Sequence, residues 1–298
     1  MHHIISIRDF KRDDIDTLLV KAQKIQSLSS YKRTLDGKLV ALLFFEPSTR
    51  TRMSFASALA RLGGDAITVD SIEGSSISKG ETLADTIRVV SSYVDAVVLR
   101  HPKEGAARLA SEFSSVPVIN AGDGAGQHPS QTLLDLFTIK ENMPLDGIDV
   151  GLIGDLRYGR TAHSLAYALS NYNVRIHTIA PKGLEMPQGL TKELKDRDTE
   201  IIEHSSVDEI INELDVLYAT RIQRERFPDS ASYSRVAHSY RITPETLENV
   251  RENLILLHPL PRAGEIDQGV DKLPYAKYFR QAENGIPIRI AMLEDVML

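Results

Sequence analysis

One short segment brings together the residue types that bind a phosphate group. Ser48, Thr49 and Thr51 carry hydroxyl groups on both sides of Arg50, directly after the apolar residues 39–45. An apolar strand that passes into a helix leaves unpaired N–H groups at the first helical turn, and an arginine adds a planar fork of donors. Capping of the helix by Ser48 or Thr49 needs only one hydroxyl and no arginine. The segment therefore predicts a phosphate-binding site, with an ordinary helix cap as the structural alternative.

A glycine-rich segment, residues 151–160 with the sequence G-L-I-G-D-L-R-Y-G-R, follows a predicted strand and opens a predicted helix. Its spacing differs from the G-x-G-x-x-G dinucleotide pattern, and the next predicted strand ends without an acidic residue for a ribose hydroxyl. No G-x-x-x-x-G-K-[ST] motif occurs in the chain either. We therefore expect no nicotinamide or nucleotide P-loop site. The turns serve to expose Arg160, or they are purely structural.

The composition excludes several classes of protein. The 298 residues include no cysteine, which excludes disulfide bonds, cysteine-zinc sites and a thiol nucleophile. The 35 basic and 41 acidic side chains form no long block of one sign, so a nucleic-acid partner is not expected. No apolar run approaches the about 20 residues that span a bilayer, and the N-terminus lacks an export signal, so the expected location is the cytoplasm. With no H-E-x-x-H motif, we expect neither a metal nor a cofactor.

Short apolar runs alternate with longer amphipathic stretches from about residue 39 onward, which is typical of repeated β-α units around parallel sheets. The predicted fold class is therefore α/β, with two domains, each a mostly parallel sheet flanked by helices. The first set of predicted strands comprises residues 39–45, 66–69, 96–99 and 116–119, with helices at 52–62 and 81–93. The second set comprises residues 150–153, 174–179, 199–202, 216–218 and 254–257.

Two further segments are predicted to be helical and to bridge the domains. Residues 129–142 form a helical pattern that opens at Pro129. The tail from residue 275 is also helical in pattern, and Pro287 should bend or break it.

The phosphate segment also carries a family resemblance. Residues 48–52, S-T-R-T-R, resemble the signature of the aspartate/ornithine carbamoyltransferase family. The motifs R-H-P at 100–102, Q-H-P-S-Q-T at 127–132 and H-P-L-P-R at 258–262 follow in the family's order and spacing. The resemblance thus covers nearly the whole chain.

The resemblance predicts a reaction and an acceptor. The ornithine enzymes of the family carry H-C-L-P and an S-M-G loop, whereas this chain has H-P-L-P and no S-M-G. The implied reaction is therefore carbamoyl transfer from carbamoyl phosphate to L-aspartate, an early step of de novo pyrimidine biosynthesis. Ornithine or another amine is the alternative acceptor, and a non-catalytic phosphate-binding module on the same fold is the alternative outside catalysis.

By this resemblance, two groups of residues would bind carbamoyl phosphate. The phosphate would be held by Ser48, Thr49, Arg50 and Thr51. The carbonyl oxygen would be polarised by Thr51, Arg100 and His128, and the amide nitrogen would be bound by Gln131. Taken singly, Arg100, His128 and Gln131 also have structural alternatives, as a sheet-edge residue, a packed histidine and a solvated helix residue.

The same resemblance assigns residues to aspartate. Its two carboxylates would be held by Arg160, Arg221 and Gln223, because a bidentate guanidinium matches a carboxylate in charge and geometry. The main-chain carbonyls of Pro259 and Leu260 would orient the amino groups at the reacting centre.

Two further contacts would depend on closure and on a neighbouring subunit. Glu46 would tie the domains together by pairing with Arg160 and Arg226 in a closed form, with a surface salt bridge of about 0–1 kcal/mol as the alternative. Ser75 and Lys79 would reach the active site of a neighbouring subunit.

The implied assembly is a homotrimer with shared active sites, to which regulatory chains would bind in a larger assembly. Ser78 stands where a second lysine is common in the family, which leaves the exact contacts of the Ser75–Lys79 loop open. The implied domains are a carbamoyl-phosphate-binding domain over residues 1–135, completed by a C-terminal helix at about 280–298, and an aspartate-binding domain over residues 136–279.

Overall fold

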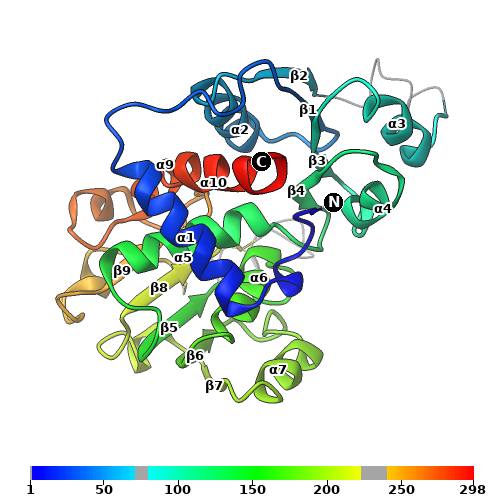
Figure 1. The fold of residues 1–298 in the computed structure, drawn as a ribbon. Coiled ribbons are helices and arrows are strands. Elements are labelled where there is room, and N and C mark those ends of the chain that lie inside the picture. The colour runs from blue at the N-terminus through cyan, green and yellow to red at the C-terminus, as the bar shows by residue number, and fades with distance from the viewer. Residues whose placement is uncertain (1, 71–79, 223–239) are drawn as a thin grey trace. The chain divides into compact units, whose positions relative to one another are not determined.

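The computed structural model describes residues 2–70, 80–222 and 240–298, which form two compact units. Unit 1 comprises Met1–Leu134 and Asn284–Leu298, and unit 2 comprises Asp135–Glu283. Within the described residues, no helix has both the length and the apolar character that a membrane span requires. Figure 1 shows the ribbon with its elements labelled.

Unit 1 contains a four-stranded parallel sheet in the order β2-β1-β3-β4. Its strands are β1 (Leu39–Phe44), β2 (Asp65–Val69), β3 (Ala96–His101) and β4 (Val118–Asp123). Its helices are α1 (Arg12–Gln26), α2 (Thr49–Arg61), α3 (Leu83–Val90), α4 (Ala106–Phe113) and α10 (Gly285–Met297), with a 3-10 turn at Ile7–Asp9. Strands β1, β3 and β4 are apolar and buried because helices cover the sheet, whereas most of β2 is exposed.

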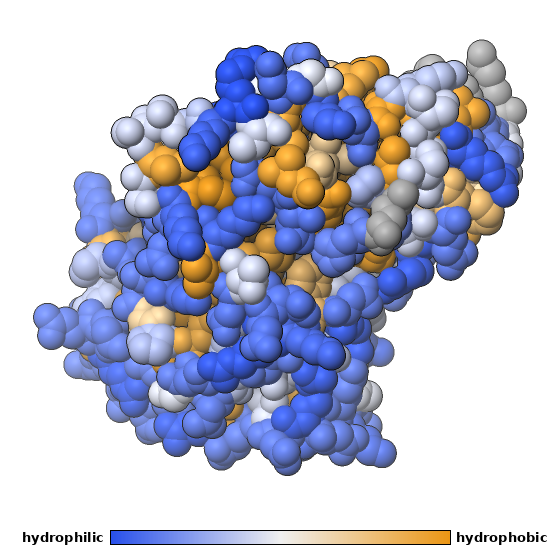
Figure 2. All heavy atoms as spheres, viewed as in Figure 1, coloured by the Kyte–Doolittle hydropathy of each residue, from blue (hydrophilic) through white to orange (hydrophobic). Residues whose placement is uncertain are grey.

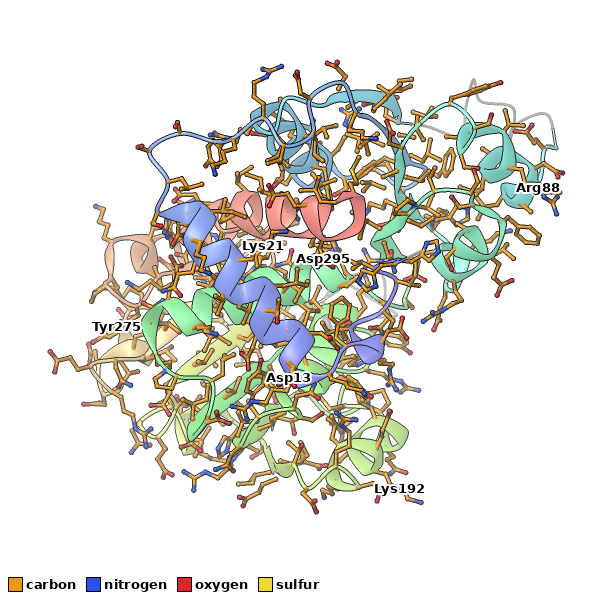
Figure 3. The ribbon with its side chains drawn as sticks, in the orientation of Figure 1. Asp13, Lys21, Arg88, Lys192, Tyr275 and Asp295 are labelled. Carbon is orange, nitrogen blue, oxygen red and sulfur yellow. The ribbon has the colours of Figure 1, made fainter. Side chains whose placement is uncertain are left out.

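Helix α10 is almost entirely buried, since it packs against both α1 and α2. Figure 3 shows α1 running alongside α10, with Lys21 and Asp295 labelled on the two helices. Lys21 Nζ lies 3.3 Å from a carboxylate oxygen of Glu294, and the buried Arg289 donates to Ser54 Oγ at 3.0 Å. The last helix of the chain is therefore an integral part of unit 1.

Unit 2 contains a five-stranded parallel sheet in the order β7-β6-β5-β8-β9. Its strands are β5 (Ile148–Ile153), β6 (Val174–Ile179), β7 (Glu200–His204), β8 (Val216–Ala219) and β9 (Ile255–Leu257). Its helices are α6 (Arg160–Leu169), α7 (Gln188–Lys195) and α9 (Tyr278–Glu283), with 3-10 turns at Val207–Glu209, Glu245–Leu247 and Gln268–Lys272. Helix α5 (Pro129–Asn142) carries the chain from unit 1 into unit 2.

The predicted fold class is confirmed: both sheets are parallel, helices lie between their strands, and α5 has the predicted bounds. The predicted interruption of the C-terminal helical tail near Pro287 is confirmed. Helix α9 ends at Glu283 and α10 begins at Gly285, so the break at Asn284 lies within the turn before Pro287, whose ring clashes with the carbonyl four residues back. Pro287 is in the first turn, where a backbone N–H has no partner within the helix, so the missing donor costs nothing there.

Candidate active site

The predicted phosphate segment lies where β1 passes into α2. Ser48 occupies the N-cap position of α2, but its side chain makes no capping hydrogen bond. The first turn contains Thr49, Arg50 and Thr51 and no acidic residue, so no carboxylate in the turn competes for the helix N-terminus. Thr51 is buried and Arg50 is exposed. The local structure therefore suits an anion better than it suits a simple helix cap.

Arg100 lies beside this segment because β3 pairs with β1, in a register that sets Arg100 against Phe44. Its Nη1 donates to the carbonyl oxygen of Ala121 at 3.0 Å, and its Nη2 pairs with the carboxylate of Glu46. The side chain is only 9% exposed. A guanidinium held at two of its nitrogens keeps one direction, which a group that polarises a substrate must do.

Gly122 is the point at which Arg100 and His128 come together. Its φ is +119°, and a Cβ there would lie 2.7 Å from Arg100 Nη1 and 3.4 Å from His128 Cδ2. Only glycine leaves room for both side chains in this conformation. Gly122 was not among the predicted site residues, although the glycine-rich run at residues 120–126 was a signal of close backbone approach.

His128 directly precedes α5, and it is 5% exposed. Its Nδ1 lies 3.3 Å from Ser130 Oγ, and its carbonyl oxygen accepts the N–H groups of Gln131 at 2.9 Å and Thr132 at 3.2 Å. Gln131 is half-buried and lies in the first turn of the helix. The start of α5 therefore sets the positions of His128 and Gln131 together.

A buried aspartate holds the loop that leads to His128. Asp123 Oδ1 accepts the N–H of Gln127 at 2.7 Å and a side-chain N–H of Asn120 at 3.1 Å. Its Oδ2 accepts the N–H of Gly105 at 2.9 Å. Each carboxylate oxygen thus fixes a different part of the chain, and the loop has little freedom to move His128.

In unit 2, the residues that are predicted to bind the substrate aspartate follow three neighbouring strands. Arg160 is the first residue of α6, after β5, and Arg221 follows β8. Pro259 and Leu260 follow β9, and β5, β8 and β9 are adjacent in the sheet. The carboxyl ends of parallel strands lie at one edge, where ligands bind in open α/β sheets.

Gly154 allows two of these segments to pack closely. With φ at +121°, a Cβ at Gly154 would lie 2.4 Å from the carbonyl oxygen of Thr220. Thr220 in turn donates its N–H to the carbonyl oxygen of Ile153 at 2.8 Å. The glycine therefore serves the close packing of the segment after β5 against the segment that leads to Arg221.

The backbone of Leu260 has an unusual conformation. Its φ is +55°, the peptide bond to Pro261 is cis, and its N–H donates to His258 Nδ1 at 2.8 Å. A leucine in the left-handed region costs about 1–2 kcal/mol. The hydrogen bond to His258 offsets part of this cost.

Four predicted site residues lie outside the described residues: Ser75, Lys79, Gln223 and Arg226. Glu46 is described, and it pairs with Arg100 within unit 1. Its predicted pairing with Arg160 and Arg226 in a closed form stays a prediction. Across residues 2–70, 80–222 and 240–298, no group of three or more histidine or acidic side chains has a metal-binding arrangement.

Both units match models of known domains. The model described as the carbamoyl-P binding domain of aspartate/ornithine carbamoyltransferases matches residues 2–141. The model described as the Asp/Orn binding domain of the same family matches residues 146–296.

Full-length relatives agree with these matches. The chain is 71% identical over 297 residues to an aspartate carbamoyltransferase catalytic subunit from Methanoculleus marisnigri, with 100% of both chains covered. A structure of the catalytic subunit of aspartate transcarbamoylase from M. jannaschii is similar at TM-score 0.94 and 50% identity, covering 99% of this chain and 98% of that one. The Trypanosoma cruzi aspartate transcarbamoylase in complex with N-(phosphonacetyl)-L-aspartic acid is similar at TM-score 0.92 and 40% identity, with 99% and 96% covered.

Proposed function

The chain belongs to the aspartate/ornithine carbamoyltransferase family, and we infer that it transfers the carbamoyl group of carbamoyl phosphate to L-aspartate. The products are N-carbamoyl-L-aspartate and phosphate, and the reaction is an early step of pyrimidine biosynthesis. The observation that carries this inference is the 71% identity over the full chain, which extends through both substrate domains. The H-P-L-P motif at 258–261, without the cysteine of the ornithine enzymes, supports aspartate as the acceptor.

We propose that unit 1 binds carbamoyl phosphate. Ser48, Thr49, Arg50 and Thr51 hold the phosphate at the N-terminus of α2, where unpaired N–H groups and the helix dipole favour a dianion. Arg100 and His128 meet at Gly122, and they donate to the carbonyl oxygen together with Thr51. Gln131, in the first turn of α5, binds the amide nitrogen.

We propose that unit 2 binds aspartate. Arg160 and Arg221 follow adjacent strands and pair with the two carboxylates, with Gln223 as a further donor. The carbonyls of Pro259 and Leu260 accept hydrogen bonds from the amino groups. Carbonyl acceptors suit an N–H donor, and guanidinium groups suit carboxylates, so the chemistry of each element matches one part of the substrate.

The mechanism follows from these donors and acceptors. The uncharged amine of aspartate attacks the carbamoyl carbon, and negative charge develops on the carbonyl oxygen as the bond to phosphate breaks. Donors fixed toward that oxygen stabilise the charge, and holding two substrates in reacting geometry contributes about 7–11 kcal/mol. The leaving phosphate accepts the amine proton, so the reaction needs neither a covalent intermediate nor a dedicated protein base.

We propose that the chain works as a homotrimer. Strand β2 is an edge strand whose residues are mostly exposed, including Ile67 at 47%, and Met53 on the neighbouring α2 is 63% exposed. Figure 2 shows apolar residues at the surface in this region of unit 1. Parallel sheets are normally covered, so a second copy of the chain is a suitable cover for this edge.

In that trimer, Ser75 and Lys79 contribute to the neighbouring subunit's active site. The curated relatives are named catalytic subunits, which supports regulatory chains as further partners. The cytoplasm is the proposed location.

The decisive experiment supplies the purified chain with carbamoyl phosphate and either L-aspartate or L-ornithine. Carbamoyl-aspartate should form rapidly, and citrulline should form at background rate. Citrulline as the main product would reverse the choice of acceptor. If a folded protein that binds phosphate forms neither carbamoyl-aspartate nor citrulline, the non-catalytic alternative would be supported.

A further inference from the structure

The side chain of His258 has a contact on each of its two ring nitrogens. Its Nδ1 accepts the N–H of Leu260 at 2.8 Å, so Nδ1 carries no hydrogen and the ring hydrogen lies on Nε2. The Nε2 atom lies 2.6 Å from Glu265 Oε1, a close charge contact, and neither atom has a hydrogen-bond partner of standard geometry within the described chain. At this distance a ring lone pair on Nε2 would repel the carboxylate, so a hydrogen on Nε2 is favoured. The contacts therefore select one tautomer of His258.

Glu265 is suited to hold that tautomer. Its second oxygen, Oε2, accepts the N–H of Ala263 at 2.8 Å. Burial raises the pKa of Glu265, but hydrogen bonds from His258 and from the backbone outweigh the burial and lower the pKa overall. The group is therefore a carboxylate at neutral pH, with one oxygen for the histidine and one for the backbone.

The backbone of His258 is anchored separately. Its N–H donates to Gln281 Oε1 at 2.8 Å, and Gln281 Nε2 donates to Asp135 Oδ1 at 2.6 Å. Tyr218 Oη donates to the other oxygen of Asp135 at 2.9 Å. His258, Gln281, Asp135 and Tyr218 are all at most 2% exposed. This chain of buried hydrogen bonds fixes the backbone position of His258. The contact with Glu265 fixes which ring nitrogen faces Leu260.

We propose that His258 is a positioning residue of the carbamoyl transfer, which orients the Pro259 and Leu260 carbonyls by holding the Leu260 N–H. Glu265 acts through His258, because only the tautomer with hydrogen on Nε2 leaves Nδ1 as an acceptor. The proposal rests on the proposed function of these two carbonyls. An error of about 1 Å in such a contact lowers turnover by roughly a hundredfold, so loss of the Nδ1 acceptor should be visible in kcat.

Two substitutions of His258 separate the two ring nitrogens. His258→Asn places an amide oxygen near the position of Nδ1 and keeps an acceptor for Leu260. His258→Gln reaches toward Glu265 but removes that acceptor. We expect kcat at saturating substrates to fall about tenfold to a hundredfold in the glutamine variant, and to recover for the most part in the asparagine variant. Inorganic phosphate should bind both with unchanged affinity, because its proposed ligands are Ser48 to Thr51.

Glu265→Gln tests the tautomer itself. A glutamine has one acceptor oxygen where the carboxylate has two, so it cannot serve both Ala263 and His258. If the oxygen stays with Ala263, the amide NH2 faces Nε2 and moves the ring hydrogen to Nδ1, against the N–H of Leu260. We expect the same loss of kcat as in His258→Gln.

His177→Gln is the matched control. His177 is 3% exposed, and its Nε2 lies 3.0 Å from Asp149 Oδ1, but Asp149 lies at the amino end of β5, away from the edge that carries Arg160 and Leu260. The His177→Gln variant should have a lower melting temperature and an unchanged kcat. A His258→Gln variant with unchanged kcat would overturn the proposal. Equal losses of kcat in the asparagine and glutamine variants, in step with their melting temperatures, would also overturn it.

A measurement without turnover keeps this inference separate from the proposed function. In protein labelled with 15N-histidine, the ring shifts of His258 should report hydrogen on Nε2 alone in the unsubstituted chain. Hydrogen on Nδ1, or on both nitrogens, would overturn the proposal even in an active enzyme. If the unsubstituted chain makes no carbamoyl-aspartate, the proposed function fails on its own, and the positioning role fails with it although the tautomer is still established.

Discussion

Gly122→Ala should damage the site without unfolding the protein. The new Cβ would lie 2.7 Å from Arg100 Nη1, whereas ordinary contact begins at 3.4 Å, so the guanidinium must retreat by more than half an ångström. Arg100 cannot do this freely, because it is buried and bonded to Ala121 and Glu46. Displacing a donor from the developing oxyanion costs on the order of a hundredfold in turnover, and we expect kcat to fall by about that factor.

The cost to stability should be much smaller. A non-glycine residue at the φ of Gly122, +119°, is strained by about 1–3 kcal/mol, against a typical total stability of about 5–15 kcal/mol. Gly37→Ala is the matched control, because Gly37 also has a positive φ, +75°, with no atom within 4 Å of the added Cβ. It should lose stability and keep turnover.

The assay is steady-state formation of carbamoyl-aspartate at saturating substrates, with circular dichroism and melting temperature measured on the same samples. If folded Gly122→Ala turns over at nearly the unsubstituted rate, Arg100 is not a fixed donor in the reaction. If Gly37→Ala loses as much turnover as Gly122→Ala, the loss comes from backbone strain in general and the argument from close approach is refuted.

Three further predictions concern other parts of the chain. Trimers of Arg50→Ala and trimers of Lys79→Ala should each be inactive. After the two kinds of subunit exchange, about one site in three of each hybrid trimer should regain both residues. Exchange without recovered activity would place the site within one chain. Arg221→Ala should raise the KM for aspartate about tenfold or more while carbamoyl phosphate binds normally, since one carboxylate loses a charged hydrogen bond; the opposite pattern would assign this residue to carbamoyl phosphate. Burial raises the pKa of Asp149, but hydrogen bonding led by Arg175 outweighs the burial and lowers the pKa below the ordinary value of 3.8. The ionised carboxylate of Asp149 therefore stabilises the fold above that pH, and this contribution is lost as the pH falls through the lowered pKa. Urea unfolding of Asp149→Asn should therefore show a weaker loss of stability in acid than the unsubstituted chain, and an equal loss would contradict the assignment.

Elements with strong local signals could be predicted from the sequence. Pro129 opens α5 at the predicted residue because a proline is favoured in the first turn and disfavoured later. Most of the strands were predicted for a similar reason, since β1, β3, β5 and β8 are continuous, largely apolar runs that are buried nearly along their whole length. Helix α2 was predicted to begin at residue 52 and begins at Thr49, because its polar first turn carries no apolar periodicity.

The sequence by itself determined the residue types of the site, since Ser48, Thr49, Arg50 and Thr51 are adjacent in the chain and a helix N-terminus needs only local structure to bind an anion.

Contacts between distant residues were decided only by the tertiary structure. Arg100 meets Glu46 because β1 and β3 pair in one register, and Arg100 approaches His128 because the backbone at Gly122 adopts a positive φ. No local pattern encodes such contacts, because each depends on which strands become neighbours and on the space left between them. The tautomer of His258 has the same origin, since it depends on Glu265 reaching its ring across a turn that the sequence alone does not specify.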